Sequence, residues 1–261
     1  MRELSYTHAM KDHMDFWESQ FSGRAIFMHV WRTILRGRVC ASQIFAWMHR
    51  DGVSSFGILM ATALCTGVMM VLQAEVYVRR FAAYHLLGWF SGYSTLREIG
   101  PVLMALMFSG RVGSAYTADL ASMRVRSHLE TLWILGVDVY AWYIVPRVLS
   151  MIFTLVCLVI VGDVVAIGGS ALCALLLLGV HPILFLNTLF HAVSVSDFAQ
   201  GLLKSVFLGV GLSCIATYVG LQAREGAASV GDAVRRYVVA SAFMIFGVDF
   251  LITYVVDILW A

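Results

Sequence analysis

The stretch from Val148 to Leu178 decides the fold class of this chain, and it reads VLSMIFTLVCLVIVGDVVAIGGSALCALLLL. Its one charged residue is Asp163. A helix of about 20 apolar residues, rising about 1.5 Å per residue, is long enough to cross the hydrocarbon core of a bilayer. We therefore predict that this stretch is a transmembrane helix.

Similar apolar blocks recur along the chain, at about residues 52–78, 86–120, 201–221 and 237–259. The 261 residues are 60% hydrophobic and only 13% charged, whereas about 25% of the residues in a soluble domain are charged. We predict an all-α integral membrane protein with five transmembrane helices. The second block contains Gly100-Pro101, and because proline lacks a backbone donor, we expect a kink or a re-entrant start there.

The residues before the first block form a separate region, 1–50, ahead of a membrane domain at 51–261. Phe27, Trp31 and Leu35 recur there at helical spacing, with arginines between them. This pattern is typical of a basic amphipathic helix that lies in the membrane interface. The alternative is a short soluble helix packed on the rest of the protein. Both interpretations place the region on the cytoplasmic side.

Basic residues mark alternate connections between the blocks. They precede the first block, follow the second and follow the fourth, at Arg24, Arg32, Arg36, Arg38, Arg50, Arg124, Arg126, Arg147, Arg224, Arg235 and Arg236. Residues 179–200 contain neither lysine nor arginine, although Arg79 and Arg80 after the first block break the pattern. Since lysine and arginine are retained in the cytoplasm, we predict a cytoplasmic N-terminus and an external C-terminus.

Several charged residues lie inside the predicted spans, where such groups normally pair or face a water-filled cavity. Counting along each helix places four of them at one depth near the outer leaflet: Arg97, Glu98, Lys204 and Asp249. Two are cationic and two anionic, so they can neutralise one another. They form either a structural ion-pair network or a gate or headgroup site, in which a cation meets a lipid phosphate.

The other charges within the spans receive different interpretations. Arg111 and Asp119 approach the cytoplasmic end of the second span, where snorkelling or capping accounts for them as well as a functional role does. Asp163 stands beside Gly162 and ahead of Gly168-Gly169. It belongs either to the same polar network or to a close-packed face between helices, and we favour the packing role.

The connection between the second and third spans is unusually apolar, and it reads MRVRSHLETLWILGVDVYAWYIVPR from Met123 to Arg147. Leu129, Leu132 and Leu135 place an apolar side on a short helix with charges around it. Such a helix lies flat on a membrane or docks into a groove on a soluble partner.

The sequence argues against several functional classes. A net charge of +2 without a basic stripe is too small to indicate a nucleic-acid partner. The chain has no GxxxxGK[ST] loop, no HExxH pair and no G-x-S-x-G turn. We therefore predict no catalytic residue, no metal site and no cofactor in this chain.

One long segment resembles a known family. LREIGPVLMALMFSGRVGSAYTADLASMRV, from Leu96 to Val125, is similar to the signature region of the MlaE/YrbE permeases, the membrane subunits of ABC transporters that move phospholipids or other lipids together with MCE proteins. The resemblance continues through LGVD at 135–138, VPR at 145–147, LLKS at 202–205 and GVDFLIT at 247–253.

The resemblance implies a homodimer of five-span permease domains in a bacterial inner membrane, with a cytoplasmic ABC ATPase that binds ATP and Mg. A periplasmic MCE-domain protein would lie above it, and a small STAS-domain protein is a further candidate partner. Phospholipid would bind in an outward-facing pocket near Arg97, Glu98, Lys204 and Asp249. A coupling helix at about 123–140 would contact the ATPase through Met123, Arg124, Leu129, Leu132, Gly136 and Asp138.

This chain departs from the family pattern at the coupling segment. It has Ser127 and His128 where the family commonly carries glutamate and glutamine, and Val139 where it carries proline. The departures leave the details of the ATPase contact open. Our leading hypothesis is a lipid-translocating permease without its own catalytic site. The alternative is a membrane scaffold or ion-conducting protein that uses the intramembrane charges without an ATPase.

Overall fold

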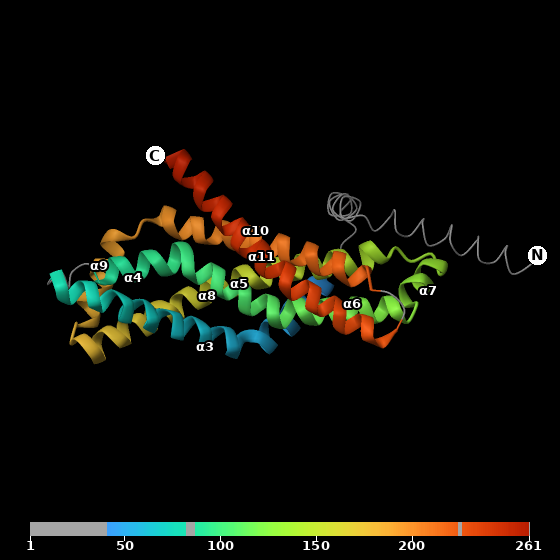
Figure 1. Cartoon of the computed structure of the whole chain (residues 1–261), viewed down its shortest axis with the longest axis horizontal. Helices are drawn as coiled ribbons and strands as arrows, with labels where there is room; N and C mark the ends of the chain where they lie inside the picture. The colour runs from blue at the N-terminus through green and yellow to red at the C-terminus, as the bar shows by residue number, and fades with distance from the viewer. Residues whose placement is uncertain (1–40, 82–86, 224–225, 261) are drawn as a thin grey trace, which may run out of the picture.

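A computed structural model describes residues 41–81, 87–223 and 226–260 (Figure 1). Every regular element in these ranges is a helix, which confirms the predicted all-α class. Four helices are each long and apolar enough to cross a membrane: α3 (Ala41–Phe81), α8 (Val145–Leu178), α10 (Val195–Leu221) and α11 (Ala227–Trp260). They contain the predicted first, third, fourth and fifth spans.

Helices α3 and α8 pack closely and run in the same direction. Gly52 lies beside Thr154, and Gly67 lies beside Ala166, so residue numbers increase in the same direction along both helices. A Cβ at Gly67 would stand 1.9 Å from the carbonyl oxygen of Ala166. Only glycine permits this approach of two backbones, as is common between helices in membranes.

The predicted second span is helical from Leu87 to Val125, but it is divided. It comprises α4 (Leu87–Ser94), the π-helical turn η2 (Thr95–Ile99), α5 (Gly100–Phe108), the π-helical turn η3 (Ser109–Gly113) and α6 (Ser114–Val125). The interruption expected at Gly100-Pro101 takes the form of η2, in which the Gly100 N–H donates to the Thr95 carbonyl. Proline removes the next donor, and the wider turn accommodates the loss.

Short helices occupy the connections. α7 (His128–Ile134) and the π-helical turn η4 (Tyr140–Ile144) lie between α6 and α8. α9 (Pro182–Ala192) lies between α8 and α10, where the sequence analysis identified no helix. Most of the predicted amphipathic N-terminal helix lies outside the described residues, and Ala41 to Met48 form the first turns of α3.

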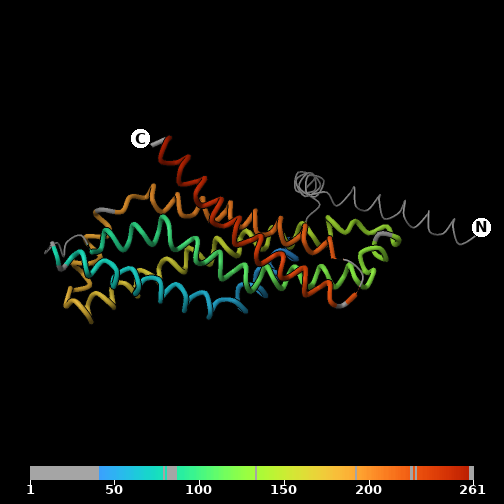
Figure 2. The backbone as a smooth tube through the Cα atoms, viewed as in Figure 1, coloured from blue at the N-terminus to red at the C-terminus, as the bar shows by residue number. Residues whose placement is uncertain are grey.

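The largest buried cluster lies where α3, α5, α6, α8 and α10 meet, and it includes Leu59, Phe108, Tyr116, Leu155 and Leu212. α11 packs against this bundle with its first half, and its C-terminal end diverges from the other helices (Figure 2). Its side chains Phe243 and Phe250 are 78% and 68% exposed. An exposed apolar face of this kind is suited to lipid or to another helix.

Candidate functional site

Lys204 on α10 is the centre of a charge network. Its side chain is only 2% exposed, and its Nζ atom lies 2.7 Å from Glu98 Oε2 on η2 and 2.8 Å from Asp249 Oδ1 on α11. Thr253 Oγ1 donates to the same Glu98 oxygen at 3.4 Å. The structure therefore brings three of the four predicted outer-leaflet residues into direct contact across three helical segments.

A glycine positions Lys204 against η2. A Cβ at Gly201 would stand 2.1 Å from the Leu96 carbonyl oxygen, so the backbones of α10 and η2 nearly touch. Lys204 follows Gly201 by three residues and therefore shares its face of α10. This close approach delivers the buried ammonium to the Glu98 carboxylate.

Arg97, the fourth predicted residue, joins the network and extends it. Its Nε atom lies 3.5 Å from Glu98 Oε1, and its Nη1 atom lies 3.9 Å from Asp197 Oδ1. It also pairs with Asp257 near the end of α11 and donates to the Tyr93 hydroxyl. Its guanidinium is 5.2 Å from the centre of the Tyr93 ring.

The sequence analysis missed Asp197 and Asp257. Asp197 precedes Lys204 by seven residues and Asp257 follows Asp249 by eight, so each lies on the same helical face as its predicted neighbour. That spacing is the signal that would have identified them. With these residues the network contains four carboxylates and two cations, so it carries an excess of negative charge rather than the predicted balance.

A second charged cluster surrounds Arg147, which the sequence analysis placed in the loop after the second span. It lies instead in the first turn of α8 and is 1% exposed. Its Nη2 atom lies 3.6 Å from Asp51 and 3.8 Å from Asp119. Its guanidinium stacks 3.9 Å from the ring centre of Trp47. Asp119 is thus an ion-pair partner of a buried arginine, while Arg111 lies exposed in η3.

The predicted coupling segment is a short helix between two turns. Leu129 is 2% exposed and belongs to the core, whereas Ile134 and Leu135 are 79% and 71% exposed. Met123 and Leu132 are half-buried, and Arg124 pairs with Glu130 at 3.0 Å.

Two residues of this segment shape its turns. Gly136 adopts a φ of 75°, which favours glycine. Asp138 Oδ1 accepts the N–H groups of Tyr140 and Ala141 at 3.0 and 3.3 Å, and so it caps η4. Both residues therefore fix the path of the chain into α8.

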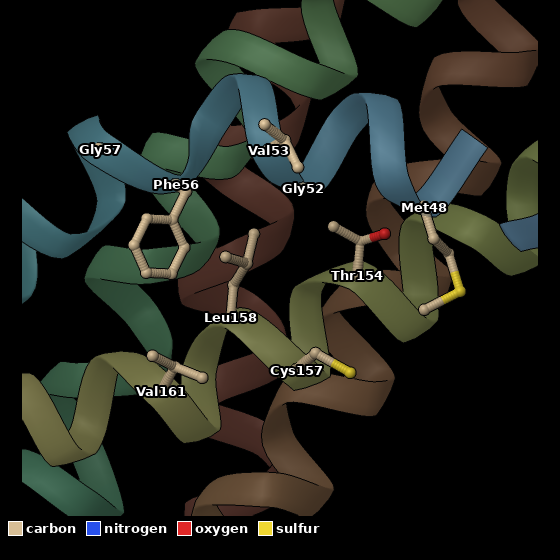
Figure 3. Close-up of a pocket in the computed structure, with 9 residues that line it drawn as sticks. All are labelled: Met48, Gly52, Val53, Phe56, Gly57, Thr154, Cys157, Leu158 and Val161. Atoms are coloured by element: carbon tan, nitrogen blue, oxygen red, sulfur yellow. The ribbon is translucent and has the colours of Figure 1, made fainter. Parts of the chain in front are cut away.

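An apolar groove of about 490 Å³ lies between α3 and α8 (Figure 3). Its lining residues are Met48, Gly52, Val53, Phe56, Gly57, Thr154, Cys157, Leu158 and Val161. None of these residues belongs to either charged cluster. Among the residues described, no three histidine, cysteine, aspartate or glutamate side chains gather as a metal site would require.

Comparison with known proteins identifies the family. The family described as Permease MlaE matches residues 44–255. A probable ABC transporter permease protein of Rickettsia felis is 32% identical over 221 residues, which cover 85% of each chain. The intermembrane phospholipid transport system permease protein MlaE of Haemophilus influenzae is 33% identical over 207 residues, which cover 79% of each chain. These matches confirm the predicted resemblance, and the chain belongs to the MlaE permease family of multi-pass membrane proteins.

Proposed function

We propose that this chain is the permease subunit of an ABC transporter that moves phospholipid between the inner membrane and a periplasmic MCE-domain protein. The observation that carries the proposal is the buried Lys204–Glu98–Asp249 network inside apolar helices of a chain of this family. Charged groups in a membrane interior are costly, and they are usually retained where substrates pass. The relative from Haemophilus influenzae is named for phospholipid transport.

The network suits a gate that opens by exchanging ion-pair partners. In the described structure, both cations already contact carboxylates, so a lipid phosphate must compete with Glu98, Asp249 or Asp257 for them. Exchanging one ion-pair partner for another costs less free energy than separating an ion pair, because an unpaired charge in a low-dielectric interior is strongly unfavourable. Lipid binding would thereby favour one arrangement of η2, α10 and α11 over another.

A homodimer would complete the site. Asp257 is 59% exposed and Glu98 is 33% exposed, although both lie on helices with apolar surfaces. Lipid tails cannot solvate these carboxylates, whereas a second copy packed on α11 would enclose them in a pocket. The exposed face around Phe243, Phe246 and Phe250 supplies the apolar part of such an interface.

Energy for transport would come from a separate cytoplasmic ATPase, which holds ATP and Mg. The end of α7 and the turn after it expose Ile134 and Leu135, and this is the part of segment 123–140 best suited to enter a groove on that partner. This arrangement requires the helical segment Leu87–Val125 to be a fifth span, with the N-terminus inside and the C-terminus outside. Residues 1–50 would lie at the cytoplasmic interface, and a small STAS-domain protein is a further candidate partner.

Lipid transfer in reconstituted vesicles tests the proposal. The permease is purified with its co-purifying partners, and transfer of a fluorescent phospholipid to the MCE-domain protein is measured for Glu98→Gln and for Asp232→Asn. Asp232 is a matched control because it is an exposed acid that pairs only with the exposed Arg235 in the described residues. We expect the first substitution to abolish ATP-dependent transfer and the second to leave it unchanged.

Two results would contradict the proposal. One is equal transfer by the wild type and Glu98→Gln. The other is a homo-oligomer that purifies without an ATPase and conducts ions, which would favour the scaffold or ion-conducting function instead.

A further inference from the structure

Asp163 lies in the middle of α8, and no described residue pairs with its side chain. Asp163 is only 3% exposed, and its Oδ1 atom receives no hydrogen bond from any residue that the structure describes. Each of the acids Glu98, Asp249, Asp51 and Asp119 has a basic side chain within 4 Å. Asp163 has no basic side chain within 4 Å among the described residues, and so it differs from these four acids.

Thr95 is the second unpartnered group at this place. It opens η2, is 1% exposed, and its Oγ1 atom has no hydrogen-bond partner among the described residues. The main chain of Thr95 and the side chain of Asp163 meet at Gly100. A Cβ on Gly100 would stand 2.5 Å from the Thr95 carbonyl oxygen and 2.7 Å from Asp163 Oδ1, so these two oxygens are close neighbours on either side of the glycine. The Thr95 carbonyl accepts the Gly100 N–H, whereas Asp163 Oδ1 beside it has no donor among the described residues.

The surrounding helices supply no positive charge to Asp163. α5 contains no ionisable residue, and the charged residues of η2, Arg97 and Glu98, are engaged with Asp257 and Lys204. On α3, Ala63 lies beside Gly162, and the nearest charged residues, Asp51 and Glu75, are each 12 positions away, about 18 Å along the helix. α10 also packs on α8, and its Lys204 is paired with Glu98 and Asp249. Among the described residues, therefore, the cations of the helices around Asp163 have other acidic partners, and none lies within 4 Å of its carboxylate.

We propose that Asp163 and Thr95 form a binding site for a small monovalent cation, a proton or Na⁺. An isolated carboxylate is unstable in a low-dielectric interior unless a positive charge accompanies it. Carboxylate, hydroxyl and main-chain carbonyl oxygens are the donors that small hard cations prefer. Interrupted membrane helices commonly bind Na⁺ or H⁺ in this way, and one carboxylate balances one charge.

The site would link ion binding to the charge network. Thr95 begins the same π-helical turn that carries Arg97 and Glu98, so a cation between Asp163 and Thr95 would stabilise the position of η2 against α8. The proposal concerns binding alone, and it does not depend on lipid transport.

Two measurements on the intact permease in lipid nanodiscs test the site. The first is thermal unfolding in NaCl against choline chloride at equal ionic strength. If Na⁺ is the ligand, it raises the unfolding temperature of the wild type, the rise disappears in Asp163→Asn, and it is reduced in Thr95→Val. The second is infrared difference spectroscopy. If a proton is the ligand, the wild type shows the carbonyl band of a protonated carboxylic acid, and Asp163→Asn lacks that band.

The control variant Asp232→Asn is expected to behave as the wild type in both measurements. The proposal is overturned if the wild type gains no Na⁺-specific stability and shows no protonated acid band that Asp163→Asn removes. If Asp163→Asn fails to fold, the wild type is compared with Thr95→Val instead. A shift of the Na⁺ effect or of the acid band in Thr95→Val supports the site. If both are unchanged, the site is refuted.

Discussion

The ammonium group of Lys204 lies 2.7 Å from a carboxylate oxygen of Glu98, although 106 positions separate the two residues in the chain. The contact joins α10 to the π-helical turn η2, and a second contact from the same nitrogen reaches α11. A single buried cation therefore holds three helical segments together, and it offers the most direct tests of the site.

Replacing Lys204 with methionine is expected to destabilise the protein by about 3–5 kcal/mol, because the change leaves Glu98 and Asp249 without their shared cation. The double variant Glu98→Gln with Lys204→Met should recover part of that loss. Thermal unfolding of both variants in nanodiscs measures the effect. A single variant as stable as the wild type would show that the ion pairs contribute nothing to stability.

Gly201→Ala is expected to separate α10 from η2, because the added Cβ would stand 2.1 Å from the Leu96 carbonyl oxygen. Such overpacking costs about 1–3 kcal/mol and should also reduce lipid transfer. Gly168→Ala is the matched control, since a Cβ there meets nothing within 4 Å in the described structure. Unfolding and transfer assays on the pair would disprove the close approach if both substitutions behaved alike.

Arg147→Lys is expected to weaken the junction between α3, α6 and α8 although the positive charge remains. The guanidinium stacks on Trp47 at 3.9 Å, and a desolvated cation–π contact contributes about 2 kcal/mol. Arg235→Lys changes an 85% exposed arginine and should alter stability by less than about 0.5 kcal/mol. A double-mutant cycle with Trp47→Leu measures the coupling, and a coupling energy of zero would argue against the stacking.

Substitutions of the buried and the exposed leucine of the coupling segment are expected to have different effects. Leu129→Ala should cost about 2–5 kcal/mol in unfolding free energy, because Leu129 is a core residue. Leu135→Asp should leave stability nearly unchanged, because Leu135 is 71% exposed, and it should abolish the response of the proposed partner ATPase to lipid. Lipid-stimulated ATP hydrolysis at the wild-type rate in Leu135→Asp would exclude this residue from the coupling contact.

Depth counting along the sequence placed Arg97, Glu98, Lys204 and Asp249 at one depth, where they could neutralise one another, and the structure brings all four into one network. It succeeded because helical rise is constant and an intramembrane charge needs a partner. It did not find Asp257, because that residue lies at the very end of the last apolar block and reads as an interfacial charge. It did not find the burial of Arg147, because an arginine that follows a proline in the connection between two spans resembles a loop residue until Trp47 and Tyr116 are seen to enclose it.

The fold, too, was predictable from the sequence in part. Long apolar blocks predicted four of the helices, since length and composition suffice for that. They did not predict that the second block would be divided by two π-helical turns, because the position of a wider turn depends on packing against neighbours. They also left α9 unpredicted, because its residues are apolar enough for a helix but too few for a span.

The glycine contacts between α3 and α8 limit how this protein can move. A shift of one helix past the other would drive a side chain into the Ala166 carbonyl at Gly67, or into Leu64 at Gly169. Sliding along this contact is therefore blocked, and the two helices behave as one rigid body. A rearrangement of the bundle would therefore keep α3 and α8 together and move other helices against them, among which the Lys204 network joins η2, α10 and α11.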